Sequence, residues 1–223
     1  MSEISLVGQI HFAIGSLSLL AGCAAFLLPK GRPAHVAAGR GFAISMLLLC
    51  ASGLYMSITR EIVFTVFLSL FAAHSVTTGW LAAVRRSGQM GMLERALALL
   101  IAGVGLASLV TGMWVMNTAS GELDGLPPVG FFSLGGVAIL IAMIDLQALI
   151  RRTVSSKHRI ARHVWRMGFS MFIATFIFFF GNNHVLPEVL RAEVVLIIPV
   201  LGVALATLIT VVRALIRSQR LAD

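Results

Sequence analysis

The chain has 223 residues, of which 58% are hydrophobic and only 12% are charged. A soluble domain carries about 25% charged residues, so most of this chain's surface is expected to face lipid. The net charge of +8 does not indicate a nucleic-acid partner, because the basic residues stand in short clusters between apolar runs. That pattern is typical of the cytoplasmic loops of a membrane protein.

Seven apolar segments are long enough to cross a bilayer, which takes about 20 residues in a helix. Lipid offers the backbone no hydrogen-bond partners, and the segments are too long and too unalternating for barrel strands, so they must be helices. The sequence therefore predicts an all-α fold, a single seven-helix transmembrane domain over residues 1–223. The predicted segments are approximately Ile4–Leu28, Val36–Ile58, Ile62–Val84, Leu97–Met116, Val129–Ile150, His163–Gly181 and Glu193–Val212.

The basic residues also predict the orientation of the chain. All but two of the 17 Lys and Arg residues fall on alternate connections and on the C-terminal tail. The two exceptions, Arg60 and Arg191, lie on the other side together with most of the acidic residues. Since Lys and Arg collect on the cytoplasmic side, we expect the N-terminus outside and the C-terminus in the cytoplasm.

The sixth predicted helix belongs to a stretch, Arg162–His184, that has a histidine near each end. Small residues at Ser170, Ala174 and Gly181 form a stripe along one side of this helix, and phenylalanines occupy the other. Small residues let membrane helices approach closely. We expect the stripe to be a packing surface, with the phenylalanines towards lipid or a neighbouring helix.

His74, His11 and Asp145 are ionisable residues well inside predicted spans, where such groups are costly and often functional. His74 and His11 are each either a haem ligand or proton-relay group, or a neutral histidine bonded to a neighbouring helix. Asp145 is either a proton or cation site or a carboxylate paired with a basic residue. The expected partners of Asp145 are Arg40, Arg151 and Arg166.

A second group of candidates lies at the cytoplasmic ends of the helices. We expect these residues to converge, to reach Asp145, and to bind an anionic headgroup or support a neighbouring loop. His184 is their counterpart on the outer rim. The cluster at the inner rim consists of Lys30, His35, Arg40, Arg162, His163 and Arg166.

Histidines on different helices raise the possibility of b-type haem. Two imidazoles that share one haem must lie at the same depth, and the rise of ~1.5 Å per helical residue gives no well-matched pair at the centre of the membrane. A single haem near one face is the remaining arrangement. It would use His11 with His184, or His74 with His163.

Two short motifs resemble those of a known group of proteins. His35–Arg40 reads HVAAGR and follows Lys30-Gly31, and Arg162–Met167 reads RHVWRM before a Phe-rich helix. These motifs resemble elements of an uncharacterised family of bacterial multi-pass membrane proteins. The resemblance implies the bacterial inner membrane and this topology. Some relatives are similar to di-haem cytochrome b bundles, which implies haem b as a cofactor.

No catalytic motif appears in the sequence, so whether the protein is an enzyme stays open. The sequence favours a non-catalytic role in assembly, sensing, or binding of a membrane partner or of anionic lipid headgroups through the basic inner rim. One alternative is a membrane redox protein that holds b-type haem. Another is a small proton-coupled permease that uses His74, Asp145 and a kink at Pro199. A homo-oligomer is compatible with each.

Overall fold

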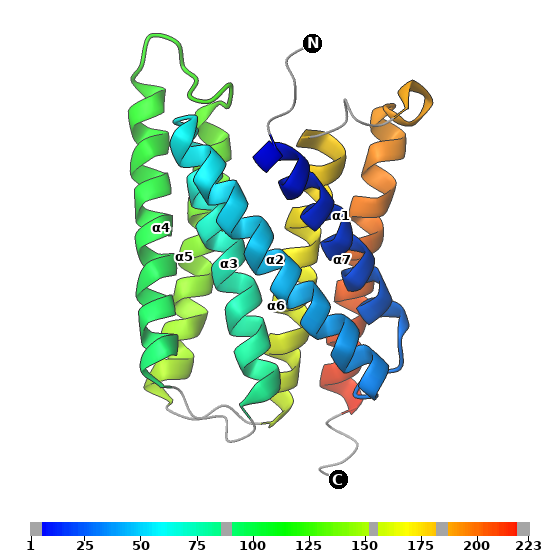
Figure 1. Cartoon of the computed structure of the whole chain (residues 1–223). Coiled ribbons are helices and arrows are strands. Elements are labelled where there is room, and N and C mark those ends of the chain that lie inside the picture. The colour runs from blue at the N-terminus through cyan, green and yellow to red at the C-terminus, as the bar shows by residue number, and fades with distance from the viewer. Residues whose placement is uncertain (1–5, 86–90, 152–155, 182–186, 218–223) are drawn as a thin grey trace. The chain divides into compact units, whose positions relative to one another are not determined.

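The computed structural model describes residues 6–85, 91–151, 156–181 and 187–217. Seven helices in these ranges are long and apolar enough to cross a membrane, which confirms the predicted all-α fold and the number of spans. The helices, labelled in Figure 1, are α1 (Leu6–Leu27), α2 (Pro33–Thr59), α3 (Val63–Val84), α4 (Met92–Met116), α5 (Pro128–Ile150), α6 (Ser156–Phe176) and α7 (Glu193–Arg217).

Several helices begin earlier than the apolar runs do. Helix α6 starts at Ser156, about two turns before His163, and α4 starts at Met92 rather than at Leu97. The apolar runs mark only the lipid-facing part of each helix, whereas long basic side chains allow a helix to continue past that part. As a result, His163 lies inside α6, whereas the sequence had placed it at the start of the helix.

The contacts divide the chain into two compact units, while the single domain expected from the sequence stays a prediction. Unit 1 comprises residues 1–49, 75–86 and 156–223, and unit 2 comprises residues 50–74 and 87–155. Helices α2 and α3 each contribute one part to either unit.

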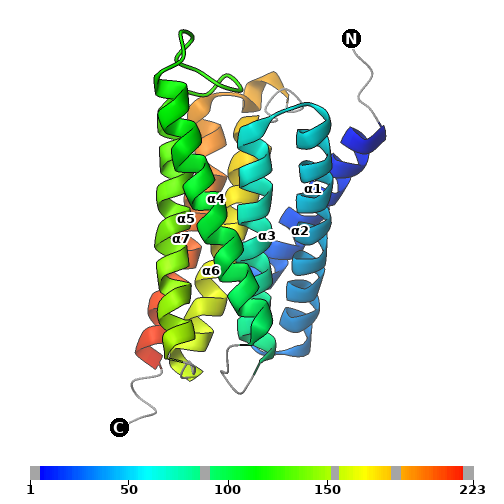
Figure 2. The same ribbon diagram turned by 90° about the vertical axis from the view of Figure 1, so that its left-hand side faces the viewer.

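Unit 2 is built on the antiparallel pair α4 and α5, which pack along one another (Figures 1 and 2). A Cβ atom on Gly135 would lie 2.8 Å from Leu109 Cγ and 2.9 Å from the carbonyl oxygen of Gly105. Ser108 Oγ donates a hydrogen bond of 2.8 Å to the Phe131 carbonyl. Small residues thus allow the close approach that membrane helices need.

The connection between α4 and α5 also contacts α3 at one end of unit 2. Asp124 has a positive φ of 57°. Its Oδ2 accepts a hydrogen bond of 2.8 Å from the backbone N–H of Phe64, in the first turn of α3. The first N–H groups of a helix have no partner within the helix, so Asp124 caps α3 and ties the loop to it.

Unit 1 contains α6 packed along α7, with α1 also in contact with α6. A Cβ atom on Gly168 would overlap the Thr207 side chain, so α6 and α7 meet at van der Waals distance. A Cβ atom on Gly22 would lie 2.5 Å from Met171 Sδ. At Gly168 the neighbouring helix occupies the space of a side chain, whereas at Gly22 the flexible Met171 side chain would have to move.

The face of α6 that carries small residues is buried as predicted at Ser170 and Ala174, but Gly181 is exposed. After Phe176 the helix widens into a π-helical segment, η1 (Ile177–Gly181). The rings of Phe172 and Phe176 stack with their centroids 6.5 Å apart. The aromatic side of α6 is therefore a continuous ring stack along the helix.

Gly135→Ala tests the close approach of α4 and α5. The added methyl group meets the backbone of Gly105, which cannot rotate away, and overpacking costs roughly 1–3 kcal/mol. We expect a lower Tm in detergent micelles by circular dichroism. Gly136→Ala is the matched control, because its Cβ meets nothing within 4 Å. Equal Tm values for the two variants would contradict this packing.

Candidate functional site

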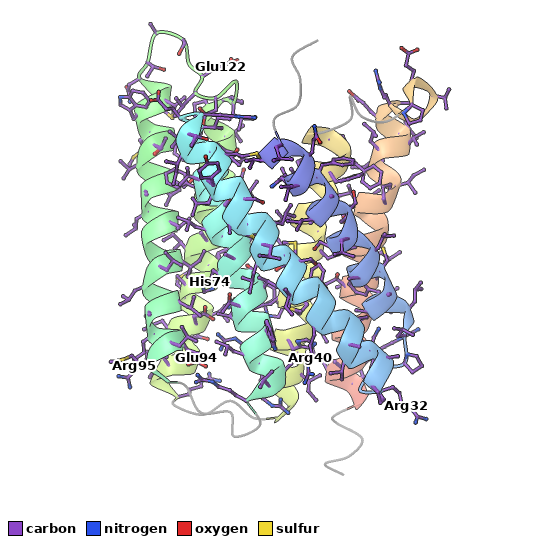
Figure 3. All side chains as sticks on the ribbon, in the orientation of Figure 1. Arg32, Arg40, His74, Glu94, Arg95 and Glu122 are labelled. Carbon is purple, nitrogen blue, oxygen red and sulfur yellow. The ribbon has the colours of Figure 1, made fainter. Side chains whose placement is uncertain are left out.

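The most deeply buried polar contact in unit 2 that involves two ionisable groups joins α3 to α5. His74 Nε2 lies 3.1 Å from Asp145 Oδ2, and the two side chains are 0% and 3% exposed. Figure 3 shows the position of His74 along α3. Both residues belong to spanning helices. The pair is therefore an ionisable site inside the part of the protein that lipid surrounds.

The burial of this pair decides its chemistry. A single charged side chain at the centre of a membrane costs about 2.5–3.5 kcal/mol on insertion scales. An imidazole beside a carboxylate lowers that cost, because the two can exist as an ion pair or as two neutral groups. Both forms of the pair carry no net charge.

The structure regroups the residues expected from the sequence. Asp145 was expected beside arginines at the inner rim, and His74 in a separate haem or proton site. The structure gives Asp145 a histidine partner, so these two candidates form one site. Its pairing with an arginine stays a prediction.

Three inner-rim candidates, Arg162, His163 and Arg166, face inwards from α6 in unit 1. Arg166 is fully buried, and its Nη1 donates a hydrogen bond of 2.6 Å to Thr78 Oγ1 of α3. His163 Nδ1 lies 2.9 Å from the Gly79 carbonyl. Arg162 is only 9% exposed.

Arg159 continues this row towards the end of α3. Its Nη1 donates to the carbonyls of Ala82 and Ala83 at 2.9 and 3.2 Å. The last carbonyls of a helix have no partner within the helix and carry partial negative charge. Arg159 therefore caps the C-terminal end of α3, and His163 contacts the helix one turn earlier.

Lys30 and His35 do the same for α1. Lys30 Nζ donates to the Ala25 and Phe26 carbonyls at 2.9 and 2.6 Å. His35 Nδ1 lies 3.0 Å from the same Ala25 oxygen. Partial burial lowers the pKa of the Lys30 ammonium. Lys30 and His35, which were expected to bind a ligand at the inner rim, thus cap α1, as the neighbouring Arg159 caps α3.

The remaining candidates are dispersed. Arg40 is exposed on α2, and His11 is half-buried on α1. His184 lies outside the described residues, so its pairing with His11 stays a prediction. Within the ranges that the structure describes, no three His, Cys, Asp or Glu side chains are grouped as metal ligands.

One buried acid was missed by the sequence analysis. Glu94, in the first turn of α4, is 6% exposed, and its Oε2 accepts a hydrogen bond of 2.9 Å from the Gly91 N–H. Figure 3 shows it near the start of α4. The signal was an acid three residues after a glycine that precedes an apolar run, a spacing typical of a capping box. The adjacent Arg95 made it resemble a surface residue.

Comparisons with protein-family models, with curated proteins and with solved structures found no match for this chain. The family resemblance of the two sequence motifs therefore stays a prediction.

Thr78→Val tests the contact between α3 and α6. The change keeps the shape of the side chain but removes the acceptor of the buried Arg166 guanidinium. Hydrogen bonds to charged groups contribute roughly 1.5–3 kcal/mol, so we expect a marked fall in Tm. Thr111→Val is the control, since that hydroxyl bonds within its own helix, to the Ala107 carbonyl. A Tm unchanged from wild type in Thr78→Val would contradict the role given to this bond.

Proposed function

We propose that this multi-pass membrane protein translocates protons, as part of proton-coupled transport, and that the His74–Asp145 pair is its proton-binding site. The observation that carries the proposal is the 3.1 Å contact between two side chains that are almost fully buried within spanning helices. Ionisable groups in this setting mark proton relays in pumps and transporters.

The pair has three protonation states that differ by one charge each. With one shared proton, the pair is neutral overall, either as aspartate with imidazolium or as carboxylic acid with imidazole. Loss of that proton leaves one negative charge, and gain of a second leaves one positive charge. Because a net charge is costly in this buried site, the charged protonation states favour a conformation in which the site is more exposed to water. That coupling is what a proton-driven carrier needs.

Haem ligation fits His74 less well than proton binding does. The imidazole Nε2 faces a carboxylate oxygen at 3.1 Å, and that nitrogen is the one most free to reach a metal in an extended side chain. At His163 the ring nitrogen Nδ1 faces a backbone carbonyl. The surroundings of His74 thus support an exchangeable proton at the ring.

Proton flux into proteoliposomes tests the proposal directly. Purified protein is reconstituted with pyranine inside, and a pH gradient is imposed together with valinomycin and potassium to balance charge. We expect faster acidification than in protein-free vesicles. Asp145→Asn and His74→Ala should each slow it at least about tenfold, since a positioned proton carrier contributes ~10²–10⁴-fold.

His11→Ala is the control for loss of an intramembrane histidine, and it should retain the flux. Asp145→Glu, which keeps a carboxylate, should retain part of it. Monodisperse elution on size exclusion shows that each variant is folded. Wild-type flux no faster than in protein-free vesicles, or full flux in both Asp145→Asn and His74→Ala, would overturn the proposal.

We also propose the bacterial inner membrane as the location, with the N-terminus outside. The distribution of basic residues supports this orientation. Arg32 and Arg40 are exposed at the start of α2 in unit 1, which favours contact with anionic headgroups of the inner leaflet as a second role. Near such a surface each cation contributes about 1 kcal/mol of attraction.

Thiol labelling tests the orientation. Single cysteines replace two exposed residues, Ser120 between α4 and α5 and Ala34 at the start of α2, after Cys23 and Cys50 have been changed to Ala. A membrane-impermeant maleimide added to intact cells should label Ser120→Cys only. Labelling of Ala34→Cys only would reverse the orientation.

A further inference from the structure

We propose that Glu94 is the relay carboxylate through which protons pass between the end of unit 2 where α4 begins and the His74–Asp145 pair. The inference rests on the proposed function and names a further residue of the same site. It is based on the seven-residue spacing of the buried residues of α4 and α5 along the interface between the two helices, which we call the seam.

The buried side of α4 follows a seven-residue repeat. Glu94, Ile101 and Ser108 are 6%, 0% and 0% exposed and lie seven residues apart. A seven-residue spacing returns a side chain to nearly the same side of a helix that packs along a partner. Glu94 therefore faces the same seam as Ser108.

The buried side of α5 repeats in the same way. Phe131, Ala138 and Asp145 are 0%, 0% and 2% exposed and are also seven residues apart. Asp145 therefore lies on the face of α5 that carries Phe131.

One hydrogen bond sets the register between the two helices. Ser108 Oγ donates to the Phe131 carbonyl at 2.8 Å. From this point Glu94 and Asp145 are reached by the same number of residues, two repeats towards the start of α4 and two towards the end of α5. At ~1.5 Å per residue each lies roughly 21 Å from the bond. In an antiparallel pair the two acids thus stand at about the same level of one seam.

The direction of the Glu94 side chain gives the order of the relay. Its Oε2 accepts from the Gly91 N–H, so the carboxylate turns towards the loop that precedes α4. The Asp145 carboxylate turns the other way, to His74. The Glu94 carboxylate thus turns towards the start of α4, and the Asp145 carboxylate turns towards His74.

A proton taken up by Glu94 passes through bridging water to Asp145 of the pair. Glu94 is left as a carboxylate that can take up the next proton. Among the described residues at this end of α4 and α5, Arg95 and Arg151 are also charged, and both are exposed.

Glu94→Gln separates relay from structure, because the amide oxygen can still accept the Gly91 N–H while the side chain cannot carry a proton. The readouts are proton flux into proteoliposomes and the infrared carboxyl band that Asp145→Asn removes. We expect flux to fall at least about tenfold, with the Asp145 band and its equilibrium titration retained. Added formate or azide, small acids that enter the site, should restore flux in part.

Asp124→Asn is the matched control, because it makes the same acid-to-amide change in a residue that also accepts a backbone N–H, at the other end of unit 2. Its flux should equal that of wild type. Glu94→Asp keeps an acid and should retain flux. It serves as the second test variant if Glu94→Gln folds poorly. Wild-type flux in Glu94→Gln, with flux still lost in Asp145→Asn, overturns the relay alone. Absence of flux from the wild type overturns the proposed function instead.

Discussion

The cost of placing ionisable groups where lipid excludes water governs this structure. An unpaired charge in such a place is several kcal/mol unfavourable, so each buried ionisable side chain needs a partner close by. His74 and Asp145 meet this requirement by facing one another at 3.1 Å within unit 2. In the proposed proton site, the pair carries no net charge with one proton and one negative charge without it.

The same constraint explains the basic side chains of unit 1. A helix ends with carbonyls that its own backbone cannot satisfy. Arg159 bonds to those of α3, and Lys30 and His35 bond to those of α1. These side chains thereby complete the two helix ends. The exposed Arg32 and Arg40, near the start of α2, are available to headgroups.

The number and type of helices follow from the sequence, because apolar length is a property of each segment taken alone. The suspicion that His74 and Asp145 are functional follows for the same reason. Their pairing does not, since it depends on tilt and on which helix faces come together. The burial of Glu94 could not be predicted, because an acid in the first turn beside Arg95 has the same local sequence pattern whether it faces water or another helix. The contacts of His35 and His163 could not be predicted either, because they depend on carbonyls of neighbouring helices.

The central claim is that His74 and Asp145 hold a proton together. It is tested most directly by ¹⁵N NMR of the histidine-labelled protein in micelles across pH, with the His74 signals assigned by their loss in His74→Gln. Sharing predicts that the His74 ring nitrogens titrate and that Asp145→Asn displaces the midpoint by about one pH unit or more, since a carboxylate within ~4–6 Å shifts a neighbour by this amount. His74 signals that are the same in wild type and in Asp145→Asn at every pH would contradict it.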